Sequence, residues 1–269
     1  MWQAYRRKKL LSVPFPPEGE RMVAQGCPWY QRLPVADQQE LKEKVQIFLA
    51  EKKFEGCGGL VITEEMRLDI AAEACLLLLH RPSDYYPALR TILVYPTSYF
   101  VPTTRPVGLG VWEEGWQARS GESWQAGAVV LAWADSRPRT DAPRLTSVVL
   151  HEFAHQLDYE NGAADGTPAL GAGQPFFMRG KIFTQWKAVM DAEFSRLQGQ
   201  IQRGEPTFLR PYAAMNPAEF FAVATEAFFL RAEEMKTTQA SLYQQLALYY
   251  RQDPTLWRPP TPSAADSAP

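Results

Sequence analysis

Two histidines and a glutamate in one short segment have the types and spacing of a metal site. Residues 148–158 read Val-Val-Leu-His-Glu-Phe-Ala-His-Gln-Leu-Asp, so His151 and His155 lie four positions apart in an apolar run. On a helix, such side chains share a face with Cβ atoms roughly 5–6 Å apart, and both imidazoles can reach one tetrahedral zinc ion. Glu152 can accept a proton from a water molecule that the metal activates. The alternative is a helix that buries one imidazole and exposes the other.

A catalytic zinc ion needs a third protein ligand, with the fourth position left to water. The remaining histidine, His80, precedes Arg81-Pro82 at the end of a predicted helix, where an imidazole more often satisfies carbonyl groups. The third ligand must therefore be a carboxylate. Glu219 and Glu226 are the candidates, because a carboxylate among so many apolar neighbours is costly unless it is paired or bound to metal.

The spacing of these two glutamates leaves the choice between them open. Glu219 stands in a capping-box position relative to Asn216, which would turn its carboxylate back on the helix start. Glu226 could be an ordinary residue on the face of a helix. At least one of the two is predicted to be functional or salt-bridged.

Two helices must hold these residues. One is predicted over residues 144–158, with Asp141 as its N-cap, and it carries the histidine pair. The other begins where Asn216 can act as N-cap and Pro217 can occupy the first helical position. The predicted active-site cleft lies between these two helices.

The rest of the chain predicts an α+β fold that is mostly helical, with a small mixed sheet. Apolar periodicity and β-branched runs predict further helices over 37–53, 63–79, 181–203 and 237–250, and strands over 91–95 and 128–133. The segment 123–133 is either the sheet-edge strand that pairs with substrate in peptidases of this motif or an ordinary buried strand. Residues 161–180, rich in Gly, Ala and Pro, are either a mobile flap or a variable surface insertion.

We expect three segments in the chain. Residues 1–34 are proline-punctuated and are predicted to be an irregular segment packed on the body. Residues 35–257 form the metal-binding domain. Residues 258–269 are rich in Pro, Ala and Ser, and are predicted to be a disordered tail.

Composition narrows the choice of partners and compartment. A net charge of −2 and a pI near 6 give no general attraction to nucleic acid or to an anionic membrane. The basic run at residues 6–9 is interpreted as a solvated segment, and no apolar stretch of signal-peptide or membrane-spanning length occurs. Three irregularly spaced cysteines indicate reduced thiols rather than a disulfide framework. We therefore expect a cytoplasmic protein without direct nucleic-acid or membrane binding.

Two segments together resemble a known family. The pairing of His-Glu-Phe-Ala-His-Gln-Leu-Asp at 151–158 with Asn-Pro-Ala-Glu-Phe-Phe-Ala-Val at 216–223 is similar to the Mlc titration factor A (MtfA) family of bacterial zinc metallopeptidases. More distantly, both segments resemble the catalytic domain of anthrax lethal factor, which also has a tyrosine seven residues before its glutamate ligand. The two motifs together are far more specific than either alone.

The resemblance implies roles for five residues. His151, His155 and Glu219 match the zinc ligands, Glu152 matches the catalytic base, and Tyr212 matches a tyrosine near the metal. It implies a zincin-like (gluzincin) metallopeptidase that holds one zinc ion and has aminopeptidase-like activity on small peptides. It also implies binding to the transcription repressor Mlc, which would link the protein to the control of sugar uptake.

Two further acidic residues and one alternative function complete the predictions. Glu226 is expected to orient a histidine ligand, and Asp158, three residues past His155 on the same face, is the rival for that task. The alternative is a non-catalytic protein that keeps the zinc fold and sequesters a transcription repressor. The presence of Glu152 favours chemistry, because a structural zinc site needs no base and usually has four protein ligands.

Overall fold

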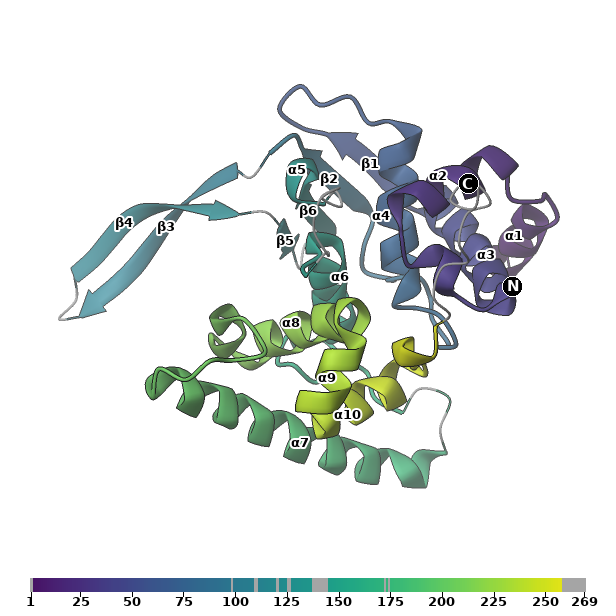
Figure 1. The fold of residues 1–269 in the computed structure, drawn as a ribbon. Coiled ribbons are helices and arrows are strands. Elements are labelled where there is room, and N and C mark those ends of the chain that lie inside the picture. Colours follow the sequence, from purple (N-terminus) through teal and green to yellow (C-terminus); the bar gives the residue numbers. More distant parts are fainter. Residues whose placement is uncertain are drawn as a thin grey trace, which may run out of the picture.

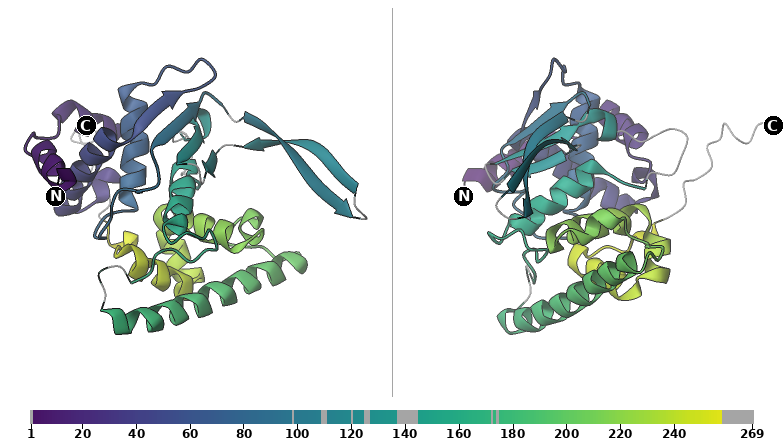
Figure 2. Two further views of the ribbon diagram at one scale, coloured as in Figure 1. Left: turned by 180° about the vertical axis from the view of Figure 1, so that it is seen from behind. Right: turned by 90° about the vertical axis from the view of Figure 1, so that its left-hand side faces the viewer.

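The computed structural model shows a mostly helical chain with a small sheet, which confirms the α+β prediction (Figure 1). It describes residues 2–97, 99–108, 111–119, 121–124, 127–136, 145–171, 173 and 175–257, with the backbone alone for 99–124 and Phe176. The helices before the sheet and those after it lie on different sides of α6 (Val148–Tyr159), which carries both predicted histidine ligands (Figures 1 and 2).

The main sheet has four strands in the order β1-β2-β6-β5 and is mixed, as predicted. β1 (Lys53–Gly56) and β6 (Ala128–Ala132) both run parallel to β2 (Thr91–Tyr95), whereas β5 (Gly121–Trp124) runs antiparallel to β6. The predicted strand at 128–133 is therefore an interior strand, and β5 forms the edge nearest to it. The interpretation of 128–133 as an ordinary buried strand holds.

A second, two-stranded sheet extends away from the body as a ribbon (Figures 1 and 2). It consists of β3 (Tyr99–Gly108) and β4 (Val111–Arg119), paired antiparallel over almost their full length. This long pairing was not predicted from the sequence. The ribbon leaves the main sheet between β2 and β5.

The first 34 residues are helical, so the prediction of an irregular segment was wrong. They form α1 (Trp2–Leu11), α2 (Pro17–Gly26) and the short η1 (Tyr30–Arg32). Proline breaks the interior of a helix, but Pro17 occupies the first turn of α2, where its missing N–H costs nothing. The segment is held on the body by contacts such as the Arg7–Glu51 ion pair, which periodicity within the segment does not reveal.

Two long helices lie between this segment and the sheet. α3 (Val35–Glu51) packs against α4 (Glu64–Leu76), which is buried along almost its whole length. The Thr63 side chain caps α4 by accepting a hydrogen bond from the Met66 amide at 3.2 Å. The helix ends three residues earlier than residue 79, where the prediction had placed its end.

The helix of the histidine pair begins at Val148, four residues later than predicted. Its N-cap is Ser147, whose hydroxyl accepts a hydrogen bond from the Leu150 amide at 3.1 Å. The predicted cap, Asp141, lies outside the described residues. The short helix α5 (Trp133–Ser136) precedes it in the sequence. Ser147 is fully buried, so the start of α6 is held within the protein interior.

The C-terminal part is a set of helices below α6 in Figure 1. The predicted single helix at 237–250 is in fact two helices, which meet at Gln239. Within the described ranges, no helix combines the length and apolarity that a membrane span requires. The predicted tail at 258–269 lies outside those ranges. The elements are α7 (Phe176–Gln202), η2 (Pro211–Ala214), α8 (Pro217–Leu230), α9 (Ala232–Thr238), α10 (Ala240–Tyr250) and η3 (Pro254–Leu256).

Aromatic contacts fix the two helices that carry the candidate site. Phe153 of α6 is fully buried, with its ring centroid 4.9 Å from that of Tyr86 and 5.7 Å from that of Phe48. Phe221 of α8 packs on Trp186 at 5.8 Å. Truncation of such a buried Phe costs about 3–5 kcal/mol, so these contacts hold each helix in a defined position.

Candidate metal centre

The two histidines of α6 lie on one face of that helix, opposite the buried Phe153. His151 and His155 have ring centroids 4.8 Å apart, with the ring planes nearly perpendicular. His151 is buried and His155 is half-buried. The face that carries both imidazoles is therefore turned toward α8, against which α6 packs.

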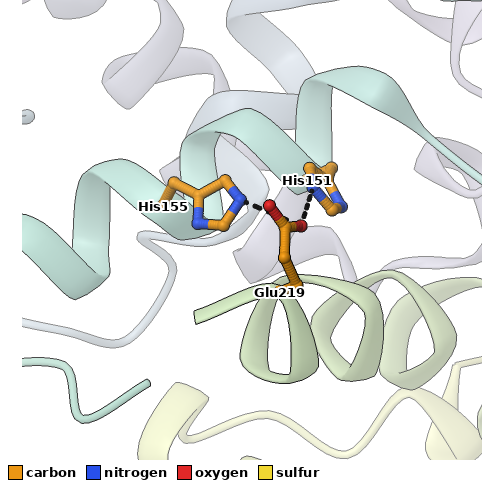
Figure 3. A group of neighbouring side chains, drawn as sticks. All are labelled: His151, His155 and Glu219. Carbon is orange, nitrogen blue, oxygen red and sulfur yellow. Dashed lines mark hydrogen bonds and ion pairs between the residues drawn. The ribbon is translucent and has the colours of Figure 1, made fainter. Parts of the chain in front are cut away.

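Glu219 of α8 brings its carboxylate to both rings (Figure 3). Its Oε2 lies 3.0 Å from His151 Nε2 and 3.5 Å from His155 Nε2. Among the described residues these three side chains form the one group of metal-ligand type, with all ligand atoms within 4.8 Å of one another. Ligand atoms about 2.1 Å from a tetrahedral metal ion lie roughly 3.4 Å apart, so the observed separations fit such an ion.

Glu219 takes part in the start of α8, but through its backbone and not through its carboxylate. Its backbone N–H donates to Asn216 Oδ1 at 2.9 Å, so Asn216 is the N-cap of α8 as predicted. The Glu219 carboxylate, however, points to the imidazoles and not back to the helix start. One residue thus takes part in the cap through its backbone and in the metal-ligand group through its side chain.

Glu226 lies behind His151 and is almost fully buried, with a side-chain exposure of 3%. Its Oε1 is 2.8 Å from His151 Nδ1, and its Oε2 accepts a hydrogen bond from the Ser147 amide at 2.9 Å. A proton on Nδ1 leaves the Nε2 lone pair of the imidazole free for a metal ion. The geometry therefore places Glu226, of the two carboxylates considered, where it can orient a histidine ligand.

Asp158 is also buried, but it serves a different part of the chain. Its Oδ2 accepts a hydrogen bond from the Gly166 amide at 2.8 Å, which ties the loop after α6 to the end of that helix. Burial raises the pKa of this carboxyl to about 6. The loop is anchored further by Trp186, whose Nε1 donates to the Gly166 carbonyl at 3.1 Å.

Opposite charges are favoured within the ligand group. Burial opposes the charged imidazole of His151, but hydrogen bonds to Glu219 and Glu226 outweigh burial and raise its pKa to about 10. Burial likewise opposes ionisation of Glu219, but its bonds to the two imidazoles hold its pKa far below the ordinary value. A metal ion bound at His151 would compete with a proton there, so its binding would release protons.

The two remaining predicted residues flank the ligand group. Glu152 follows His151 on α6 and is buried. Tyr212 lies in η2, with its ring centroid 6.1 Å from that of His151, and 41% of the residue is exposed. His80, which the sequence analysis did not assign to the site, lies outside it. Its Nε2 is 3.2 Å from Oδ2 of Asp37 in α3.

Three residues that support Glu226, directly or through Ser147, were not predicted from the sequence. Arg210 donates a hydrogen bond from Nη2 to Glu226 Oε1. Ser147 binds Glu226 through its amide, and its hydroxyl contacts the carboxylate of Glu73 from α4. One local signal could have identified Ser147. Serine is a common N-cap, and Ser147 lies four residues before His151.

Two imidazoles and a carboxylate brought together in this way form a candidate metal site, as a metallopeptidase-like protein requires. Comparison with known proteins agrees, since the model of the glucose-regulated metallo-peptidase M90 family matches residues 2–251. The chain belongs to this family. The family implies a bound metal ion, for which His151, His155 and Glu219 are the available ligand group.

Individual relatives extend over most of the chain. The uncharacterised protein slr2042 of Synechocystis is 40% identical over 261 residues, which cover 95% of this chain and 91% of that protein. Proteins named Mlc titration factor A from Yersinia pestis and Yersinia pseudotuberculosis are 31% identical over 221 residues, which cover 81% of this chain and 78% of theirs. The resemblance to the Mlc titration factor A family is thereby confirmed.

Proposed function

We propose that this chain is a zinc-dependent peptidase with aminopeptidase-like activity, a zincin-like (gluzincin) active site and a place in the cytoplasm. One observation carries the proposal: His151, His155 and Glu219 present their ligand atoms within 4.8 Å of one another. Three protein ligands leave a coordination position for water, which is the arrangement of catalytic rather than structural zinc sites.

The ligand residues would hold the zinc ion with Nε2 of each histidine and a carboxylate oxygen of Glu219. Zinc, when bound, activates a water molecule for attack at neutral pH and polarises the substrate carbonyl group. The donor set of two nitrogens and one oxygen suits zinc. Glu226 supports the set, because it holds the Nδ1 atom of His151 at 2.8 Å.

Glu152 and Tyr212 would perform the proton transfer and the charge stabilisation. The Glu152 carboxylate takes a proton from the attacking water and passes it to the departing amine nitrogen, as a positioned general base and acid can. The Tyr212 hydroxyl donates a hydrogen bond to the oxygen of the tetrahedral intermediate. The exposure of Tyr212 beside His151 is consistent with access by a substrate.

A peptide substrate is favoured over other hydrolysable compounds by the position of β5. This strand pairs with β6 on one side, packs near α6, and has no second neighbour among the described strands. An extended peptide could add to that edge by main-chain hydrogen bonds next to the ligand helix.

Metal content and peptide hydrolysis test this proposal directly. Purified wild-type protein should hold one zinc ion per chain, and His151→Ala should lose it, whereas His80→Ala outside the site should retain it. Glu152→Gln should keep zinc and the folded state but lose hydrolysis of aminopeptidase substrates, with the surface variant Glu233→Gln as its control. Zinc in the wild type with equal hydrolysis by Glu152→Gln would refute the assigned base.

We also propose that the protein binds the Mlc repressor and so acts on sugar uptake. The support is the similarity to proteins named Mlc titration factor A. The alternative of a non-catalytic sequestering protein makes the same binding its main function. Glu152→Gln separates the two: repressor binding that persists without hydrolysis shows separate activities, and a wild type that binds repressor but cleaves no peptide supports the alternative.

A further inference from the structure

We propose that Arg210 is a positioning residue of the metal centre, which holds Glu226 and through it the ring of His151. The inference rests on the proposed function only in taking His151 as a metal ligand. Arg210 lies in the extended stretch just before η2, far from His151 in sequence, and no motif of the chain includes it.

Arg210 meets the one carboxylate that faces the back of His151. Its Nη2 donates to Glu226 Oε1, the same oxygen that contacts His151 Nδ1. Nη2 is also 3.3 Å from Nδ1, so guanidinium, carboxylate and imidazole meet within hydrogen-bonding distance. The other oxygen of Glu226 is held by the Ser147 amide.

The charge of Glu226 explains why a guanidinium is needed. A carboxylate that is 3% exposed is costly unless a positive charge or several donors compensate it. The Ser147 amide is neutral, and His151 is neutral whenever it ligates a metal ion. Arg210 is then the one full positive charge in contact with Glu226 among the described residues.

Arg210 also connects this carboxylate to the segment that bears Tyr212. Its guanidinium carbon lies 5.6 Å from the centroid of the Tyr212 ring. The side chain of Arg210 is 41% exposed, so it spans from solvent to the buried Glu226. Arg210 thereby contacts both the Nδ1 side of His151, a predicted metal ligand, and the ring of the exposed Tyr212.

The test measures zinc affinity by competition with a chromophoric chelator, independently of peptide hydrolysis. The variants are Arg210→Met, Arg210→Lys, Glu226→Gln and the double variant Arg210→Met/Glu226→Gln. Arg231→Met is the matched control, because Arg231 pairs with Glu234 at the far end of α8 and touches none of the ligand group. Urea unfolding of each zinc-free protein reports stability separately.

We expect Arg210→Met to weaken zinc binding roughly 10- to 100-fold, as is typical when a partner of a metal ligand is lost. Arg210→Lys should recover part of that loss, since it keeps the charge without the planar fork. The zinc affinity of the double variant should equal that of whichever single variant binds zinc less tightly, because both changes act through one interaction. Arg231→Met should bind zinc as the wild type does, even if it unfolds more easily.

Three results would overturn the inference. Zinc affinity of Arg210→Met within twofold of the wild type, with Glu226→Gln weakened, would show that Glu226 needs no guanidinium. Strictly additive losses in the double variant would show that the residues act independently. A wild type that binds zinc but cleaves no peptide would refute the proposed peptidase while leaving this test intact. A wild type that binds no zinc would refute both.

Discussion

A single methyl group at Gly166 should disturb the metal centre from outside it. Gly166 has φ +76°, and a Cβ atom built there would lie 2.4 Å from the Pro217 carbonyl oxygen in the first turn of α8. Side chains of L-residues cost about 1 kcal/mol in the left-handed region, and forced overpacking costs typically about 1–3 kcal/mol more. Gly166→Ala should therefore lower the free energy of unfolding by about 2–4 kcal/mol.

The same clash should reach the proposed metal ligand Glu219, because Pro217 precedes it by two residues. A shift of α8 by a few tenths of an ångström exceeds the tolerance of about 0.2 Å for metal–ligand distances. If the loop moves instead, Gly166 loses its contacts to Asp158 and Trp186. We expect weaker zinc binding in the first case and unfolding at lower urea concentration in both.

Gly162 in the same loop supplies the control. It has φ +92°, and a Cβ atom there would meet nothing within 4 Å. Gly162→Ala should therefore show the backbone strain alone, a loss of about 1 kcal/mol. Urea unfolding monitored by far-UV circular dichroism measures both variants, and chelator competition measures zinc. Equal unfolding midpoints for the two variants would refute the packing of this loop against α8.

Two further predictions concern buried ionisable groups. Burial raises the pKa of Asp158 from 3.8 to about 6, so the folded protein binds this proton more tightly and the free energy of unfolding falls as pH rises from about 4 to 6. Asp158→Asn should remove this fall, at most about 3 kcal/mol, in urea titrations of the zinc-free protein across that range. Lys52 donates to the carbonyls of Tyr86 and Leu89 at 2.8 and 2.7 Å, and Lys52→Met should cost about 2–3 kcal/mol in thermal or urea unfolding because both acceptors lose their donor. The first prediction is contradicted if Asp158→Asn keeps the pH profile of the wild type. The second is contradicted if Lys52→Met unfolds at the same midpoint as the wild type.

The helices that carry the ligand residues could be predicted because their signals are local. Asn216 followed by Pro217 specifies the start of α8 within two residues, and the four-residue spacing of the histidines specifies their common face. The start of α6 was misplaced because its cap is a buried serine directly before the apolar run and not the acidic residue upstream. Propensity does not distinguish two good caps when the choice depends on what surrounds them.

The remaining errors concern contacts between segments far apart in the chain. α1 has little apolar periodicity, and it is held by pairs such as Arg7–Glu51, which are 44 residues apart in sequence. The sequence could not distinguish the roles of Glu219 and Glu226 for the same reason. Both lie on one stripe of α8, and only the packing of α8 across α6 gives one carboxylate the Nε2 side of His151 and the other the Nδ1 side.

This division between the two glutamates explains how His151 links α6 to α8. His151 and Glu219 are 68 residues apart in sequence, yet they pair directly, because a raised pKa on the imidazole and a lowered one on the carboxylate favour opposite charges. The pair therefore holds α6 and α8 together through His151 Nε2 and Glu219 Oε2, the atoms proposed to bind metal. Aromatic packing also positions both helices, so a metal ion bound by these residues would spend little of its binding free energy on ordering the chain.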